Sequence, residues 1–568
     1  MSGTGLIPRE DTRAPVRGHR PRPWRPVLYL LPAALLVGVV LVLPLVWAVV
    51  DSLHGGLGNY AGVLRDGQVR HAVRNSLFWL ILAPVICLFG LLLAWAISAH
   101  RRIGILAAPI AVSALVTGLA FRLIAQPGDF LLGTNGIWLL LGLAFAWQWS
   151  GLAVVVFRSG LNAIPPGLVR MARAFGVSRA RRLRTVIGPA LFPAGALVLI
   201  IVLVAAARVF DLILIAAPGS DQAEVDVVGL HWWRFRDDLG PGESAALTVI
   251  QFAIAAVAAL IGLWGLSREW PTNTADAEPA AGPRRRRRGR AVVVLAVAVW
   301  VVPLVVLLLT SLHTPRAAAG GGWWSGGFGF ESYRQAFQSG GLTGALVNTG
   351  ARSVFAAVLL PVVAVPAAYA LAWGGLPRRV NHALIAVTTM VAVVPPQTVI
   401  VELGRVFDRL HLLGAPTALT IVHTAFGVPL AMLLLRGAFA SVPREIVHAR
   451  RYDAEPGSPL FAVVRETLPA LVTVAVLEFV LVWNDYVVGL LLGGPEAGQV
   501  TFVLSDQARQ FVTSESVMAA GAVVATVIPL GLVLATGNWL VRGFTSGVRP
   551  AASRPELRQP PRRHGRAP

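Results

Sequence analysis

The stretch AIPPGLVRMARAFGVSRARRLRTVIGP, Ala163 to Pro189, is rich in arginine and lies between two long apolar segments. A second polar stretch, SVPREIVHARRYDAEPGSPLFAVVRETLP, Ser441 to Pro469, lies between two apolar segments of the C-terminal half. Because a polar loop of this length occurs once in each half, at a similar place, the pair indicates a repeated unit. We refer to them as the first and second polar stretches.

The first polar stretch predicts a short amphipathic helix. Pro165 suits the first helical turn, where its missing N–H costs nothing, and Gly176 can end the helix. Arg170 and Arg173 lie beside a single apolar stripe at helical spacing, formed by Leu168, Met171, Ala172 and Phe175. Such a stripe packs on the chain's own helix ends, on the membrane interface, or in the groove of a partner protein.

The composition indicates a membrane protein. Of the 568 residues 55% are hydrophobic and only 14% are charged, whereas soluble domains carry about 25% charged residues. The uncharged run 27–50 is long enough to cross a bilayer as a helix, and similar runs recur to the end of the chain. Because helices satisfy their backbone groups internally, as lipid demands, the expected fold class is an all-α polytopic membrane protein.

Further matches between the halves keep the same order. PLVWAVVDSLH at Pro44–His54 matches PLVVLLLTSLH at Pro303–His313, and Tyr60 and Asn75 have the same separation as Tyr333 and Asn348. We therefore expect two tandem six-helix domains with about twelve spans. The first six fall near 27–50, 75–98, 103–124, 136–157, 186–216 and 245–266, and the other six near 291–311, 346–373, 381–401, 415–435, 466–490 and 515–540.

The expected organisation has five parts. They are an N-terminal tail at 1–26, a first domain at 27–266 with its core at about 71–266, an Arg-rich linker at 267–290, a second domain at 291–543 with its core at about 344–540, and a C-terminal tail at 544–568.

The net charge of +21 comes from 49 arginines, since the chain has no lysine. The arginines gather in the tails, the linker and the polar stretches, as the positive-inside rule predicts for cytoplasmic segments. We expect a multi-pass protein of the plasma or inner membrane with both termini and both polar stretches in the cytoplasm. The lipid bilayer, and not nucleic acid, explains the basic charge.

Several chemistries have no motif here. A Walker A phosphate loop requires a lysine, and the sequence contains no CxxC, HExxH, GxSxG or metal-spaced cluster. The chain is therefore not expected to be an enzyme, and it is expected to bind no cofactor or metal of its own.

The polar stretches resemble the EAA motif of binding-protein-dependent ABC importer permeases (type I). The first matches at Ile164, Pro165, Leu168, Ala172, Gly176, Ser178, Ile187 and Pro189, and the second at Pro443, Glu445, Ala449, Asp453, Leu468 and Pro469. The resemblance covers most of 25–548, including VWNDY at Val482–Tyr486. It is closest to sugar permeases of the maltose and glycerol-3-phosphate type, here as two permease units fused in one chain.

The resemblance implies a permease that imports a small solute, most simply a sugar or sugar derivative. It implies coupling helices that dock on an ABC ATPase dimer, which would bind ATP–Mg, and an extracytoplasmic solute-binding lipoprotein as a second partner. The coupling residues would be Pro165, Leu168, Arg170, Met171, Ala172, Gly176, Pro443, Glu445, His448, Ala449, Asp453 and Gly457.

Both polar stretches depart from the family motif at its acidic position. Arg170 and His448 stand where the motif has glutamate, and Phe175 replaces the aspartate in the first stretch. The hypothesis is that the ATPase carries a complementary change, or that Glu445 and Glu455 take over.

Polar groups inside spans are candidates for the substrate path, because they are costly there. Glu478 and Asp485 lie seven residues apart on one face of a span, with Asn484 beside Asp485. Trp147, Gln148 and Trp149 lie near the outer third of the fourth span, where the indoles could stack on a sugar. For the carboxylates the alternative is an interhelical hydrogen bond, and for the indoles it is anchoring in the aromatic belt.

Two other polar sites have a structural interpretation. Arg208 and Asp211 lie one turn apart and are expected to pair, and His423 is expected to be a hydrogen-bonded packing residue.

Two other functions fit parts of the sequence. A twelve-span secondary transporter of the major facilitator type also has parallel six-span halves, but it does not require the two polar stretches. A membrane scaffold that has lost transport would explain the missing motif carboxylates.

Overall fold

The computed structural model describes residues 25–97, 104–125, 136–164, 166–266, 286–315, 327–338, 341–447, 458–493, 498–509 and 514–546. Within these ranges the elements are helices, and the extended structure is a single bridge between His313 and Phe328. The predicted all-α fold class is confirmed.

The first half runs from α1 to α12. Its elements are α1 (Arg25–Val37), η1 (Gly38–Val42), α2 (Leu43–Ser52), α3 (Gly58–Arg65), α4 (Gly67–Ala96), η2 (Gly104–Ala111), α5 (Ala114–Ala125), α6 (Gly136–Ala163), α7 (Pro166–Ala174), α8 (Arg179–Arg182), η4 (Leu183–Ile187), α9 (Gly188–Ala207), α10 (Asp211–Ala216), α11 (Val228–Phe235) and α12 (Pro241–Leu266).

The second half repeats this order. Its elements are α13 (Arg286–Ser311), α15 (Glu331–Gln338), α16 (Leu342–Trp373), α17 (Arg378–Ala392), α18 (Pro396–Arg409), α19 (Pro416–Ala440), α21 (Pro459–Glu466), α22 (Leu468–Trp483), η5 (Gly489–Gly493), α23 (Val500–Arg509) and α24 (Glu515–Ser546).

Eight described helices are long and apolar enough to cross a membrane, or up to eleven if each of three bent helix pairs is one span. Four predicted spans are not continuous helices. The prediction at 381–401 is wrong in this respect, because α17 and α18 meet at 84°. Two prolines cause the break: Pro395 and Pro396 have no N–H to donate to the preceding turn.

The other three interruptions lie in the predicted spans 103–124, 186–216 and 466–490. The first consists of η2 and the short helix α5, the second breaks between α9 and α10, and the third ends at Trp483. The first break is as apolar as its neighbours, so hydropathy gave no sign of it, and its carbonyl groups at Ala111 and Val112 accept from distant side chains. The other two contain charged residues, Arg208 and Asp485 among them, which an average over a long apolar run does not mark as breaks.

Equivalent hydrogen bonds support the two-fold repeat. The hydroxyl groups of Ser52 and Tyr60 lie 2.8 Å apart, and those of Ser311 and Tyr333 lie 2.7 Å apart. At the start of α11 the Val228 N–H donates to Ser76 Oγ over 3.0 Å. In the same way, the Val500 N–H at the start of α23 donates to Thr349 Oγ1 over 3.0 Å.

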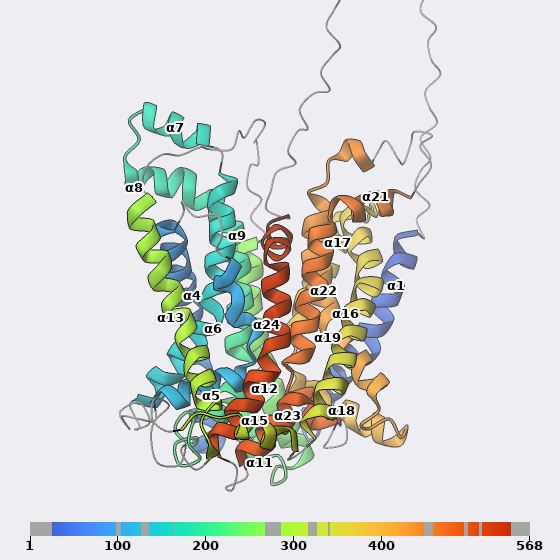
Figure 1. Cartoon of the computed structure of the whole chain (residues 1–568). Coiled ribbons are helices and arrows are strands. Elements are labelled where there is room, and N and C mark those ends of the chain that lie inside the picture. Colours follow the sequence, from blue (N-terminus) through green and yellow to red (C-terminus); the bar gives the residue numbers. More distant parts are fainter. Residues whose placement is uncertain are drawn as a thin grey trace, which may run out of the picture.

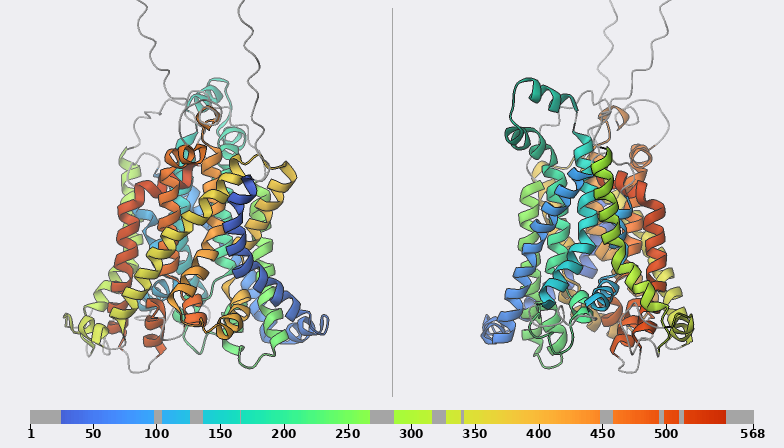
Figure 2. Two further views of the ribbon diagram at one scale, coloured as in Figure 1. Left: turned by 90° about the vertical axis from the view of Figure 1, so that its right-hand side faces the viewer. Right: turned by 60° about the vertical axis from the view of Figure 1, so that its left-hand side comes forward.

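The first helix of each half packs against the other half. α1 lies on α16 and α19, and α13 lies on α5 as well as on α24 of its own half (Figure 2). Tyr29 meets Tyr369 edge to face at 5.7 Å, and the indole N–H of Trp147 donates to Trp300 O over 3.0 Å. The two halves are therefore interlocked, an arrangement that their order in the sequence did not indicate.

The two ends of the helical bundle carry different elements (Figure 1). α7, α8 and α21 lie at one end, which we call the α7 end, and α11, α15, α18 and α23 lie at the opposite α11 end. Both polar stretches thus extend from the same end of the bundle.

Candidate functional site

The first polar stretch forms α7, as its apolar periodicity predicts. The helix ends at Gly176, which has φ +69°, a left-handed conformation that glycine adopts without strain. The N–H groups of Gly176 and Val177 then donate to Arg173 O and Ala172 O, each over 3.0 Å. The sequence thus ends the helix and directs the chain into α8.

The apolar stripe of α7 is solvent-exposed. Leu168 is 39%, Met171 54% and Phe175 83% exposed. Arg170 and Arg173 are exposed beside this stripe. Figures 1 and 2 show α7 standing apart from the bundle, so its described neighbours leave this apolar surface open. Pro165 lies outside the described residues.

The second polar stretch is described at 441–447 and 458–469. Glu445 is exposed just after Pro443, and α21 presents Phe461 at 68% exposure while burying Val463. The predicted coupling residues His448, Ala449, Asp453 and Gly457 lie outside the described residues.

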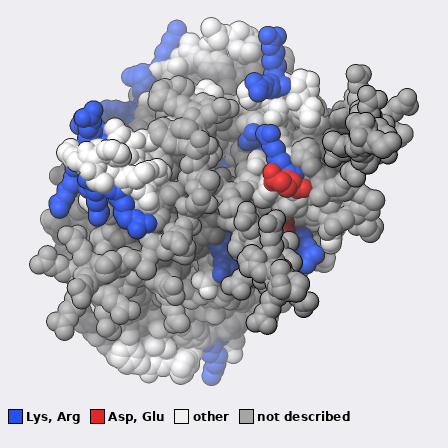
Figure 3. All heavy atoms as spheres, turned by 90° about the horizontal axis from the view of Figure 1, so that it is seen from above, with Lys and Arg blue, Asp and Glu red and all other residues white. Residues whose placement is uncertain are grey.

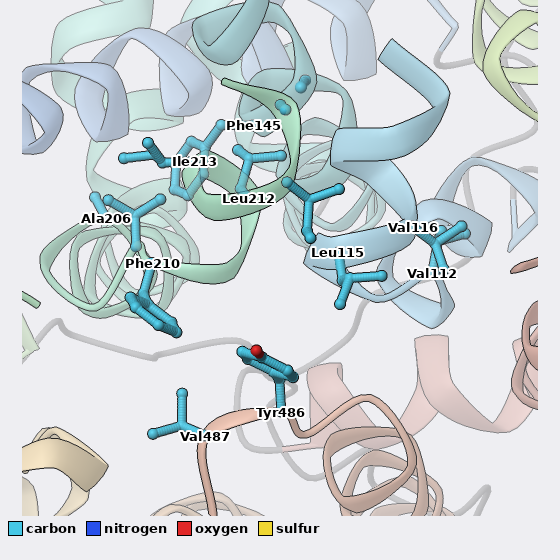
Figure 4. Packing of buried hydrophobic residues seen from close by; sticks show 14 of the residues in the cluster. Val112, Leu115, Val116, Phe145, Ala206, Phe210, Leu212, Ile213, Tyr486 and Val487 are labelled. Atoms are coloured by element: carbon cyan, nitrogen blue, oxygen red, sulfur yellow. The ribbon is translucent and has the colours of Figure 1, made fainter. Parts of the chain in front are cut away.

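Inside the bundle, the two halves meet where their fifth spans break. Phe210 is the third residue after the end of α9, and Tyr486 is the third after the end of α22. Their rings stack across the interface, with centroids 6.1 Å apart and an interplanar angle of 22° (Figure 4). We call this junction of the two breaks the seam.

The first-half side of the seam is mostly apolar. Figure 4 shows Phe210 below a cluster that includes Ala206, Leu212, Ile213 and Phe145. Two half-buried charged side chains flank Phe210: Arg208, which caps α9, and Asp211, which begins α10.

Arg208 and Asp211 were expected to pair, and no described salt bridge joins them. They interact electrostatically with each other and with Asp485 of the second half. The break between α9 and α10 lies between the two residues, so they attract each other without the direct contact that one continuous helix would give. A charged group of each half therefore faces the seam.

The second-half side of the seam is hydrogen-bonded. Gln499 donates to Val482 O over 2.9 Å and to Asp485 O over 3.2 Å, and it accepts from Arg352 Nη1. Asn484 donates to Ala111 O over 3.1 Å, which lies at the break between η2 and α5. Side-chain amides thus satisfy the carbonyl groups that the breaks leave free, as an apolar environment requires.

Asp485 lies between this network and α19. Its Oδ2 accepts from the Gly489 N–H over 2.9 Å and lies 3.2 Å from His423 Nε2. His423 Nδ1 lies 2.8 Å from Leu419 O, and because a carbonyl only accepts, Nδ1 carries the proton. His423 is thus a hydrogen-bonded packing residue, as expected.

Glu478 also faces α19, one helical turn further along from His423. Its side chain is 2% exposed, and it fits against the backbone of Gly427, where a β-carbon would lie 2.0 Å from Glu478 Oε2. Glu478 and Asp485 therefore both pack on α19. The carboxyl group of Glu478 lies in the second half and not in the seam.

The candidate residues Trp147, Gln148 and Trp149 were expected near the outer third of the fourth span. They lie in the middle of α6. Trp147 is 6% and Gln148 8% exposed. Gln148 Nε2 donates to Val112 O over 3.0 Å, so it satisfies the break between η2 and α5. Trp149 packs on Phe145 at 6.2 Å. These contacts give Trp147 and Gln148 a structural explanation, and stacking on a sugar needs exposed indole faces.

The seam is closed in this conformation by the stacked rings of Phe210 and Tyr486. Two cavities of the described structure lie elsewhere: one of about 20 Å³ between α6, α22 and α24, and a more open one of about 340 Å³ beside His71, Phe78 and Trp138. Toward the α11 end, Thr398 Oγ1 donates to Thr248 O over 3.0 Å, and Arg405 pairs with Asp51 at 3.0 Å. Both contacts join one half to the other.

Several residues of this site were missed at the level of sequence. Arg352 stands in the predicted span 346–373, and a polar side chain within an apolar run is the signal that marked Glu478. Gln499 lies in the predicted loop after 466–490, where this signal does not apply. Gly427 gives no such signal, since only the position of Glu478 shows why a side chain is excluded there.

Comparison with known proteins gives one family. The sequence profile of the binding-protein-dependent transport system inner membrane component matches twice, at residues 54–267 and 362–550. The two matches together cover well over half of the chain.

Three relatives illustrate the similarity. The osmoprotective compounds uptake permease protein GgtD of Synechocystis sp. is 31% identical over 220 residues, which are 38% of this chain and 73% of the relative. The alpha-glucoside transport system permease protein AglG of Rhizobium meliloti is 30% identical over 39% of this chain, which spans only 60% of the relative. The trehalose transport system permease protein SugB of Mycobacterium tuberculosis is 28% identical over 38% of this chain and 81% of the relative.

Among solved structures, a bacterial alginate ABC transporter in complex with an alginate pentasaccharide-bound periplasmic protein matches with a TM-score of 0.36 and 19% sequence identity. The match covers 43% of this chain and 92% of the other.

Proposed function

The chain belongs to the family of binding-protein-dependent transport system inner membrane components, and from this premise we propose that it forms the whole membrane pathway of a sugar-importing ABC transporter. The family consists of transport components, and this chain is a multi-pass membrane permease with two fused permease units. The imported solute, the partner subunits and the orientation are the parts that we propose.

The observation that carries this proposal is the closed seam between two equivalent breaks. Phe210 and Tyr486 stack where the halves meet, and the inter-half contacts of Thr398 and Arg405 lie toward the α11 end. A solute can pass only if the halves separate, first at one end and then at the other. Because α1 and α13 tie each half to the other, rotation about the seam fits better than full dissociation.

The ATPase would dock at the α7 end, where the two polar stretches extend from the bundle. This end would face the cytoplasm, in keeping with its arginines. The chain has no lysine for a Walker A loop, so ATP–Mg would bind to an ATPase dimer of separate chains. A solute-binding lipoprotein would deliver the solute at the α11 end.

The proposed solute class rests on the relatives. The relatives include permeases named for alpha-glucosides and trehalose, and a melibiose/raffinose/stachyose import permease of Bacillus subtilis is 26% identical over 38% of the chain. Arg208, Asp211 and Asp485 would line the path when the seam opens, since carboxylate and guanidinium groups form hydrogen bonds with hydroxyl groups.

Transport in reconstituted vesicles tests the proposal. The chain would be combined with the ATPase and binding protein that co-purify with it, and uptake of radiolabelled trehalose, melibiose and alpha-glucosides would be measured with and without ATP. Sugar-stimulated ATP hydrolysis and ATP-dependent uptake are expected. Uptake driven by a proton gradient alone would instead support a secondary transporter, and neither activity would support a scaffold.

A further inference from the structure

The exposed surface of α7, α8 and η4 has one sign of charge. Between 166 and 187 the sequence has six arginines and no acidic residue: Arg170, Arg173, Arg179, Arg181, Arg182 and Arg184. All are exposed except Arg182, which is half-exposed. Figure 3, a view onto the α7 end, shows arginine side chains in several groups among the residues that are not grey, with acidic side chains beside some of them. We call 166–187 the first docking surface.

The first docking surface combines this charge with an open apolar row. Leu168, Met171 and Phe175 are exposed together on α7, with Arg170 and Arg173 beside them. A partner that covers the apolar row also takes these guanidinium groups out of water. Burial of an arginine is favourable only when carboxylate or similar acceptors receive its N–H groups.

The second polar stretch lacks such a bias among its described residues. Arg444 lies next to Glu445, and Arg465 lies next to Glu466. Each arginine there has an acidic neighbour in the sequence, so the charges of these described residues cancel. The requirement for an acidic partner is therefore specific to the first docking surface.

The position of α7 favours a protein over the lipid surface as this partner. In Figures 1 and 2, α7 lies farther out along the bundle than α8 and well beyond the ends of the long helices. Lipid headgroups reach the arginines of α8 and η4 more easily than Arg170 and Arg173.

We propose that the first docking surface binds an apolar groove of the ATPase whose rim is acidic, with carboxylates facing Arg170 and Arg173. The proposal rests on the proposed function, because it takes the ATPase as the occupant. It adds the chemistry of the groove, which would have an apolar floor and an acidic rim.

The absence of lysine permits a direct test. Arg170→Lys or Arg173→Lys introduces the only primary amine besides the N-terminus, and a carbodiimide joins an amine to a carboxylate only where the two are in contact. The full chain would be purified from its native cells with its ATPase. It would then be reconstituted in phosphatidylcholine and phosphatidylglycerol vesicles, whose headgroups have no carboxylate.

Both variants are expected to form a cross-link to an ATPase Asp or Glu, which mass spectrometry locates. Arg334→Lys is the matched control, because Arg334 is also exposed but lies on α15 at the opposite end, and it should not couple to the ATPase. Arg465→Lys on α21 should couple less than the α7 variants. Bound ATPase without coupling at 170 and 173 would overturn this inference and leave the proposed function standing. If no ATPase co-purified with the wild-type chain, both proposals would fail.

Charge exchange provides the second measurement. The amount of ATPase that co-purifies with the double variant Arg170→Glu/Arg173→Glu should fall by about tenfold or more, because like charges would meet at the groove. The Arg170→Lys/Arg173→Lys variant should retain it. Replacing the cross-linked ATPase carboxylates by arginine should restore binding to the reversed chain, and failure of this rescue would overturn the acidic rim.

Discussion

The fifth span breaks on both sides of the seam, but different interactions hold the two breaks in place. In the second half, Gln499 donates to Val482 O and Asp485 O, and the Asp485 carboxylate accepts from the Gly489 N–H, so hydrogen bonds hold the break. In the first half, Phe210 packs among Leu212, Ile213 and other apolar side chains (Figure 4).

This difference suggests which side moves. Hydrogen bonds in an apolar medium are directional and costly to leave unmade, whereas apolar contacts do not depend on one orientation. We expect the second-half break to act as the fixed side and the first-half break to rearrange when the seam opens.

The largest effect is expected from Gln499→Leu. This change removes the donor to Val482 O and Asp485 O and the acceptor of Arg352 Nη1. Loss of a buried hydrogen bond to a charged group costs about 1.5–3 kcal/mol, and the two carbonyl groups lose their donor as well, so thermal unfolding in detergent should shift to clearly lower temperature. The first-half control is Gln222→Leu, since Gln222 donates to Leu214 O and Ala217 O in a part-buried site. There we expect about 1 kcal/mol. Equal losses would contradict the proposed difference between the halves.

A second effect is expected from Gly427→Ala. The new β-carbon would lie 2.0 Å from Glu478 Oε2, and overpacking of this kind costs about 1–3 kcal/mol. The control Gly142→Ala on α6 of the first half adds a β-carbon with no atom within 4 Å and should not destabilise. In the Glu478→Ala background the Gly427→Ala penalty should shrink. If it did not, the contact with Glu478 would not be its cause.

A smaller change in stability is expected from Phe210→Leu. Loss of the stacked ring should lower the free energy of unfolding by about 0.5–1.5 kcal/mol. It also removes a contact that keeps the seam closed. ATP hydrolysis by the assembled transporter without sugar should therefore rise. Phe121→Leu is the control, because the Phe121 ring contacts Trp147 of the same half at 6.0 Å. It should lower stability without raising hydrolysis, and a rise in both variants would argue against the seam as the gate.

The smallest effect concerns the repeated residues His54 and His313. His54 is exposed, whereas His313 is 1% exposed, and burial lowers the pKa of His313 from its ordinary value of 6.5. The unfolded chain then binds more protons than the folded chain below that value, so stability is complete above about pH 6.5 and falls as the pH decreases. His313→Gln should reduce the drop in melting temperature between pH 7 and pH 5, and His54→Gln should leave it unchanged. The same drop in wild type and His313→Gln would refute this assignment.

The sequence determined the features that depend on local pattern. Apolar runs predicted an all-α membrane fold, and repeated motifs such as those around Tyr60 and Tyr333 predicted two equivalent halves. The spacing of Leu168, Met171 and Phe175, with Gly176 after them, predicted the helix that became α7. These features follow from helical periodicity and chain order, which can be read within a short segment.

The tertiary structure decided where the spans break and what the polar residues do. Gln148 and Asn484 looked like substrate ligands, yet they donate to Val112 O and Ala111 O. These donors are needed because the break between η2 and α5 leaves the two carbonyl groups without a helical partner. A free carbonyl group and the amide that satisfies it lie far apart in the sequence, so neither segment alone indicates the other. Tertiary packing brings them together, within the first half for Gln148 and Val112 and across the two halves for Asn484 and Ala111.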